Sequence, residues 1–266
     1  LKAAAAASSL TTGDRTAPVT VGVTFDSYPR PSRHRTLAHR LGDAGYATGI
    51  FGLWHLGVPE AASLKKDRQR VADLTDPAKF AVAAGGKVKR AVAAEYAALQ
   101  EHVKKVGGFG TAERLYAGPL DGEAVVLPPG MKVHNVEWVA DGASQFIQGH
   151  AGGESPFFLY VGWTLPHGPD AEKSLQEGKM GYTPAGSWKP NAQLAKTTQA
   201  TRAEVRRRLR STDGGEAEVI SFQGHKNYAS ALQWLDRGVG TIVWALQHKG
   251  VMHATLLAFA SDHGNV

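Results

Sequence analysis

Apolar residues follow two different periods along the chain, and together they predict alternating helices and strands. Short apolar runs of strand length occur at Ala47–Phe51, Phe157–Trp163 and Thr255–Ala260. Apolar positions three and four residues apart predict helices at Thr36–Gly45, Ala91–Val106, Glu137–Gln148 and Asn227–His248. The apolar faces expected for the first three helices are Leu37, Leu41 and Ala44; Ala94, Ala98 and Val103; and Val139, Ala143, Phe146 and Ile147. Helices that alternate with strands are typical of crossover connections between parallel strands. We therefore expect an α/β fold with a largely parallel central sheet flanked by helices.

Two regions interrupt this alternation, at 59–86 and 168–224. We expect both to be long insertions at the active face of a single domain that covers residues 1–266, because substrate choice varies most readily in such loops. The second insertion contains the basic run Arg202–Arg210, in which Val205 and Leu209 are four residues apart. This spacing predicts a solvated amphipathic helix, and the alternative is a surface that attracts an anionic polymer.

Each predicted strand is followed within a few residues by a polar side chain suited to chemistry. His55 follows the first strand, His167 the second, and Asp262 and His263 the third. Ligands and catalytic groups of open α/β sheets collect at the carboxyl ends of the strands, so we expect these side chains to share one site. An adjacent carboxylate and imidazole also suit a metal ion. Alternatively, His55 is a core histidine bonded to a backbone carbonyl, and His167 caps a turn.

Composition narrows the classes of partner. No apolar run approaches the roughly 20 residues that a membrane-spanning helix needs, so we expect no span. The formal charge of +6 favours anionic partners, including sulfated or phosphorylated compounds. We expect no nucleic acid among them, because the basic run has no interleaved aromatic residues. The chain has no cysteine, which excludes disulfides, zinc–thiolate sites and a thiol nucleophile.

Three segments of the chain resemble motifs of the sulfatase family, within the alkaline-phosphatase-like superfamily. They occur in the family's order and extend over nearly the whole chain. Residues 36–57 resemble "TLAxxLxxAGYxT…GKWHLG", residues 156–169 resemble "PFFLY…PHxP", and residues 228–264 resemble "Y…LDxxVGxIxxxL…TLxxFxSDxG". The three motifs together are far more specific than any one of them.

The resemblance implies a function and a role for each matching residue. Family members attack sulfate esters with a formylglycine made from cysteine or serine in "C/S-x-P-S-R", beside a calcium ion. His55 matches the histidine that contacts the formylglycine hydroxyls, and His167 one that contacts the sulfate and assists the leaving group. Asp262 matches a calcium ligand, and His263 the next ligand position. The implied partner is a sulfated small molecule or sulfated glycan, and the implied location is secreted, periplasmic or lysosomal.

The chain departs from the family pattern at the positions that matter most for turnover. Ser9-Leu10-Thr11-Thr12-Gly13 resembles the "SLLTG" that follows the nucleophile motif, which places Ala3 at the nucleophile. Alanine cannot be oxidised to the aldehyde. Leu53 replaces the family's sulfate-binding lysine. We expect sequence to be missing on both sides, with the family's paired aspartates before Leu1 and a further family lysine beyond Val266. As written, the chain is therefore expected to be inactive.

Three hypotheses remain open from the sequence. The favoured one is a sulfatase-family hydrolase of sulfate esters, of arylsulfatase or glycan sulfatase type, in partial or disabled form. The second is a catalytically dead relative that binds an anion or a sulfated glycan. The third is a hydrolase of phosphate or phosphonate esters, because the superfamily reuses the same metal-centred architecture.

Overall fold

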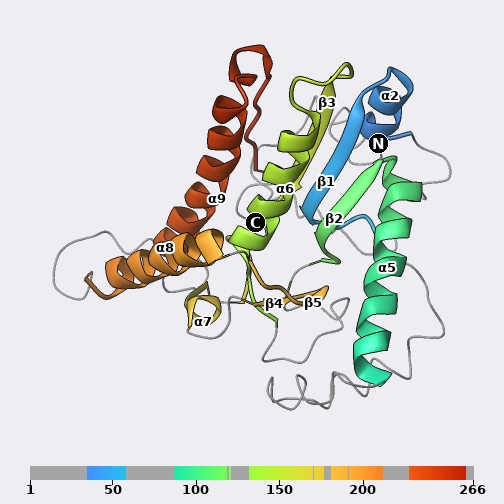
Figure 1. The fold of residues 1–266 in the computed structure, drawn as a ribbon. Helices are drawn as coiled ribbons and strands as arrows, with labels where there is room; N and C mark the ends of the chain where they lie inside the picture. The colour runs from blue at the N-terminus through green and yellow to red at the C-terminus, as the bar shows by residue number, and fades with distance from the viewer. Residues whose placement is uncertain are drawn as a thin grey trace, which may run out of the picture.

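The centre of the molecule is a three-stranded parallel sheet between layers of helices (Figure 1). The computed structural model describes residues 35–57, 87–118, 120, 132–169, 171–176, 181–190, 192–211 and 228–261. The strands are β1 (Ala47–Leu53), β2 (Thr111–Tyr116) and β3 (Phe157–Gly162), in the order β2-β1-β3. Both pairings of β1 are parallel. The α/β class predicted from the sequence is confirmed.

Helices cover both faces of the sheet because successive strand residues point to opposite sides. Ile50 of β1 packs with buried residues of α2 (Leu37–Asp43) and α5 (Lys87–Gly107). The next residue, Phe51, packs on the other face with α6 (Val136–His150) and α9 (Tyr228–His248). The predicted inward residues of α6 are confirmed, since all four are buried: Val139, Ala143, Phe146 and Ile147.

Two of the predicted helix faces are wrong, although the helices themselves are confirmed. In α2, Ala38 is fully buried and Leu37 is 59% exposed. The Thr36 hydroxyl donates to the Gly107 carbonyl at the start of α2, and Ala38 packs in the buried cluster with Ile50 of β1. In α5 the inward position of Val103 is confirmed, but Ala94 is exposed and Ala98 is half-buried, and Val92 and Leu99 complete the buried stripe.

The strand β2 was not predicted, because a bulge and two charged residues hide its pattern. Phe51 pairs with Glu113 and Gly52 with Leu115, so Arg114 is an extra residue on β2. Arg114 has a φ of 52°, and its guanidinium lies 3.2 Å from the Asp141 carboxylate. Ala112, Leu115 and Tyr116 are nevertheless fully buried. An apolar run interrupted by Glu113 and Arg114 gives no strand signal in the sequence.

The third predicted strand is wrong. After the 3-10 helix η6 (Met252–Ala254), the segment Thr255–Ala260 does not form a strand. Its large apolar side chains lie in solvent, because Leu256 is 95% exposed and Phe259 is 71% exposed. A run of apolar residues becomes a strand only where a neighbouring strand offers backbone partners.

The remaining elements lie beyond the carboxyl ends of the strands (Figure 1). They come from the second predicted insertion and consist of α7 (Ala171–Leu175), the antiparallel pair β4 (Tyr182–Thr183) and β5 (Gly186–Ser187), and α8 (Ala192–Ser211). Val205 and Trp234 belong to a separate buried cluster that joins α7 and α8 to α6 and α9. The first predicted insertion, at 59–86, lies outside the described residues.

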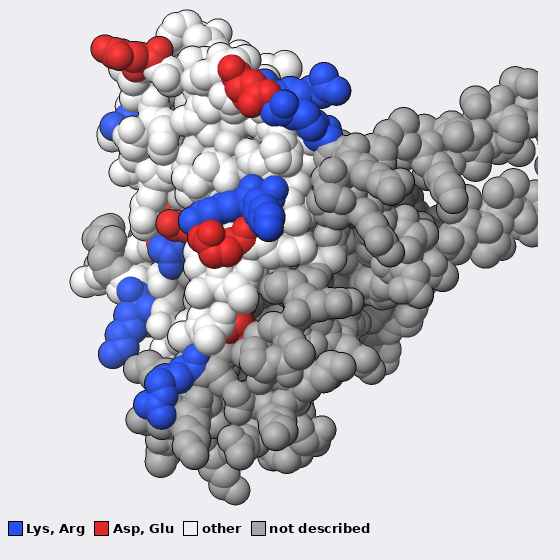
Figure 2. Space-filling model, turned by 90° about the vertical axis from the view of Figure 1, so that its right-hand side faces the viewer, with Lys and Arg blue, Asp and Glu red and all other residues white. Residues whose placement is uncertain are grey.

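Charge is dispersed on the face that Figure 2 shows. Basic side chains of the described residues form separate groups there, and those in the upper and central parts of the view adjoin acidic side chains. Among the described residues, Lys104 and Glu101 form an exposed ion pair one turn apart in α5. Among the described helices, none combines the length and the apolar content needed to cross a membrane.

Candidate functional site at the carboxyl edge of the sheet

The chain leaves β1 in a turn that buries one aromatic residue and exposes the histidine beside it. Trp54 is 5% exposed, and its indole nitrogen donates to the Gly57 carbonyl at 2.8 Å. Its backbone nitrogen donates to the Tyr116 carbonyl at 2.8 Å, which ties the turn to the end of β2. With Trp54 fixed inward, His55 is exposed. The alternative that His55 is a core histidine is therefore wrong.

The loop after β3 carries the second predicted histidine. Thr164 and Leu165 are buried, and the next residues turn the chain outward through His167, which is exposed. The His167 Nδ1 atom lies 3.3 Å from the Gly168 carbonyl oxygen, a long local contact across one peptide unit. The peptide bonds before Pro166 and Pro169 are both cis. This contact is compatible with the turn alternative for His167, and it leaves Nε2 as the ring atom directed away from that carbonyl.

The two strands approach each other most closely where they leave the sheet. Gly52 pairs with Gly162, so the ends of β1 and β3 are level. Gly52 has a φ of +88°, and a Cβ atom there would lie 1.8 Å from the Gly162 carbonyl oxygen. Only glycine fits this conformation and this spacing. The turn with His55 and the loop with His167 consequently begin side by side at one edge of the sheet.

A buried histidine bridges the two ends of the loop that carries His167. His134 is 0% exposed; its Nδ1 lies 2.8 Å from Thr164 Oγ1 and its Nε2 lies 2.7 Å from the Pro169 carbonyl oxygen. A carbonyl oxygen only accepts, so Nε2 carries the proton and donates. The His134 backbone nitrogen donates to Ser174 Oγ at 2.9 Å, beyond the loop in α7.

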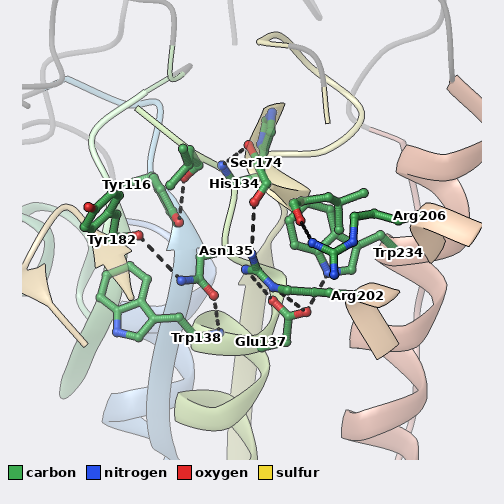
Figure 3. Close-up of polar contacts among 12 residues, drawn as sticks. Tyr116, His134, Asn135, Glu137, Trp138, Ser174, Tyr182, Arg202, Arg206 and Trp234 are labelled. Carbon is green, nitrogen blue, oxygen red and sulfur yellow. Dashed lines mark hydrogen bonds and ion pairs between the residues drawn. The ribbon is translucent and has the colours of Figure 1, made fainter. Parts of the chain in front are cut away.

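A buried ion pair fastens α8 to the same region (Figure 3). Arg202 donates through Nε and Nη2 to the two carboxylate oxygens of Glu137, at 3.3 and 3.0 Å, with side-chain exposures of only 4% and 11%. Its Nη1 donates to the Ser174 carbonyl at 2.9 Å, and Trp234 donates to Glu137 at 2.8 Å. The prediction that the basic run is wholly solvated is therefore wrong at Arg202. Its charge is retained inside because every partner is a strong acceptor.

Burial also shifts the acidity of three side chains around the sheet. Burial raises the pKa of Tyr96 to about 12, and its hydroxyl oxygen accepts the backbone N–H of Leu115 at 3.1 Å. Burial raises the pKa of Tyr116 further, so both phenols stay neutral. Burial lowers the pKa of His102, whose ring meets Trp54 edge-on at 6.5 Å. Its Nε2 is buried, with no hydrogen-bond partner among the described residues.

A comparison with models of protein families identifies the family of this chain. The family model described as Sulfatase matches residues 4–266. The chain belongs to the sulfatase family. The sulfatases are hydrolases of sulfate esters and generally bind a divalent metal, so both the family and its α/β fold agree with the resemblance seen in the sequence motifs. None of the curated proteins compared with the chain matches it.

The described residues include only some of the positions that match functional residues of the sulfatase family. Leu53, at the position of the family lysine, is the last residue of β1 and packs against the core cluster around Phe51. Ala3, at the nucleophile position, lies outside the described residues, as do Asp262 and His263. Of the predicted site histidines, His55 and His167 lie within the described residues, and both lie at the carboxyl edge of the sheet.

The described part of the chain does not by itself hold a metal. No group of three or more His, Asp or Glu side chains within it is close enough together to bind an ion. The donors of the exposed edge that are described are imidazoles, whereas a hard cation requires oxygen ligands. A divalent metal of the kind that sulfatases generally bind would therefore need ligands from beyond the described residues.

Sequence reasoning missed the residues that support the loop. His134 stands one position before the start of α6, where Asn135 accepts the Trp138 N–H at 3.1 Å as the N-cap. Asn135 followed by apolar positions is a recognisable helix start. Nothing in the sequence connects His134 with Thr164 and Pro169, which are 30 and 35 residues away, because these contacts exist only once the sheet has formed.

Proposed function

We propose that this sulfatase binds sulfate esters between the turn after β1 and the loop after β3. The observation that supports the proposal is the level pairing of Gly52 with Gly162, which starts both segments at one edge. His55 and His167 would contact the sulfate oxygens through ring N–H groups, which are suited to an anion. The exposure of His55 makes it accessible to such a ligand.

We further propose that the chain as written binds its ligand without turning it over. The formylglycine route needs a cysteine or serine at the nucleophile position, and Ala3 offers only a methyl group. Leu53 also removes a cation, and the loss of one charge-stabilising group costs about 3 kcal/mol in transition-state stabilisation. Without the nucleophile the covalent route is closed, whatever the remaining groups contribute.

For the metal we propose calcium, with Asp262 as a ligand and His263 at the adjacent ligand position. A carboxylate oxygen suits a hard cation, which when bound would polarise the sulfate oxygens. The expected consequence is that Asp262→Ala lowers the affinity for calcium, measured by titration calorimetry. Calcium binding unchanged in that variant would count against the assignment.

The sulfate-ester proposal is tested by calorimetric titration with p-nitrophenyl sulfate. His167→Ala should weaken binding by about tenfold, the effect of losing one charge-assisted hydrogen bond. The matched control is His253→Ala, because His253 is also exposed but lies in η6, which is outside the two segments proposed to bind the sulfate. Equal affinities in wild type and His167→Ala would contradict the proposed site.

The same titration separates the competing activities. No p-nitrophenol should be released from p-nitrophenyl sulfate by the chain as written, because Ala3 cannot attack sulfur. Release of p-nitrophenol from p-nitrophenyl phosphate would instead favour the phosphate-ester hydrolase.

A further inference from the structure

We propose that His134 is a positioning residue that fixes the loop carrying His167; this inference rests on the proposed function. The imidazole lies under the loop and bonds to both of its ends, Thr164 and Pro169. His167 is the third residue after Thr164 and the second before Pro169. Holding those two points restricts the path of the residues between them.

The two bonds define the orientation of the His134 ring. Since the Pro169 carbonyl only accepts, Nε2 donates at 2.7 Å. In the neutral ring, Nδ1 then accepts the hydroxyl proton of Thr164 at 2.8 Å. The other neutral tautomer, with the proton on Nδ1, would place two acceptors together at Pro169, so the neutral ring forms the bridge in one tautomer. A buried ring with both nitrogens engaged is a rigid support.

His134 is itself held from two sides. Asn135, its neighbour, begins α6, and the His134 backbone N–H is bonded to Ser174 Oγ in α7. The Ser174 carbonyl accepts from Arg202, which is paired with Glu137 of α6 (Figure 3). The insertion helices therefore contact the loop through a continuous set of buried hydrogen bonds. A support of this kind keeps an anion-binding side chain in place without touching the ligand.

The test observes His167 directly rather than activity. The chain is labelled with ¹⁵N-histidine, the His167 ring signals are assigned with His167→Gln, and sodium sulfate is titrated in. In wild type, sulfate should shift the His167 signals. In His134→Leu, which removes both ring bonds, the signals should broaden or split, and the sulfate affinity should fall by about fivefold or more.

Three further variants separate positioning from general stability. His134→Gln retains a donor for the Pro169 carbonyl and should restore most of the affinity. Thr164→Val removes one ring bond without changing His134 and should reproduce part of the defect, which decides the matter if His134→Leu does not fold. Ser174→Ala removes only the bond to the His134 backbone and leaves both ring bonds in place, so it should lower the thermal midpoint while changing the His167 signals less than Thr164→Val does.

The outcomes distinguish the two proposals. If sulfate fails to shift the His167 signals in wild type, the proposed site is wrong. If sulfate shifts them equally in wild type, His134→Leu and Thr164→Val, the site stands and the positioning role of His134 is overturned. If Ser174→Ala changes His167 as much as Thr164→Val does, the effect is one of regional stability, which also overturns the positioning role.

Discussion

β3 and the segment Thr255–Ala260 are similar in their apolar content but differ in what surrounds them. β3 pairs along its length with β1, and Leu159 packs against the buried cluster around Phe51. Thr255–Ala260 follows a crossover helix, as a strand would, yet Leu256 is 95% exposed. The difference lies in the neighbours and not in the residues: a strand exists where a partner edge supplies its hydrogen bonds, and apolar side chains alone do not create that edge.

The largest effect is expected where β3 meets β1. Gly52→Ala should destabilise the protein by about 4 kcal/mol or more, because the new Cβ collides with the Gly162 carbonyl at an already positive φ. Gly45→Ala is the matched control, since Gly45 has a φ of +87° but nothing within 4 Å of its Cβ position. It should cost about 1 kcal/mol. The free energy of unfolding in urea measures both.

Similar losses in the two variants would contradict this interpretation. They would show that the backbone conformation, and not the close approach of β1 to β3, determines the need for glycine. The level ends of the strands would then depend less on Gly52 than the structure indicates.

A pair of leucines tests the contrast between the two segments itself. Leu159→Ala should cost about 2 kcal/mol, since it removes packing from a half-buried position of β3. Leu256→Ala should change stability by less than about 0.5 kcal/mol, because its side chain is in solvent. Thermal and urea unfolding measure the difference. A comparable loss for Leu256→Ala would mean that Thr255–Ala260 is packed in solution and behaves as a strand after all.

The same contrast explains how much of the molecule could be predicted. Local periodicity was sufficient to predict the helices α5, α6 and α9 and the strands β1 and β3, although it gave only part of the buried face of α5. It failed at β2, where the bulge at Arg114 breaks the pattern, and at Thr255–Ala260, which pairs with no strand among the described residues. In both cases, whether a strand forms depends on residues that are distant along the chain.

The site shows the same limit. His55 and His167 were predicted because each directly follows a recognisable strand. His134 and Arg202 were missed as structural residues because their roles depend on tertiary contacts with Thr164 and Glu137. A buried arginine and a solvated arginine in a helix have the same sequence context, and only the carboxylate of Glu137 distinguishes them.

The smallest expected effect is on the pH dependence of stability, through His102. Its ring packs against Trp54 in the turn after β1, whereas the apolar side chains of Thr255–Ala260 lie in solvent. Burial lowers the pKa of His102 from its ordinary value of 6.5, so the folded state binds a proton less readily than the unfolded chain. As the pH falls below 6.5, the unfolded state takes up the proton first and the free energy of unfolding decreases; above 6.5 the contribution is fully present.

His102→Gln, which cannot titrate, should therefore flatten the dependence of stability on pH in this window. The check is urea unfolding at several pH values, with His253→Gln at an exposed position as the matched control that should follow the wild-type slope. A slope equally steep in His102→Gln would mean that the contact between Trp54 and His102 does not couple proton binding to the packing of this turn.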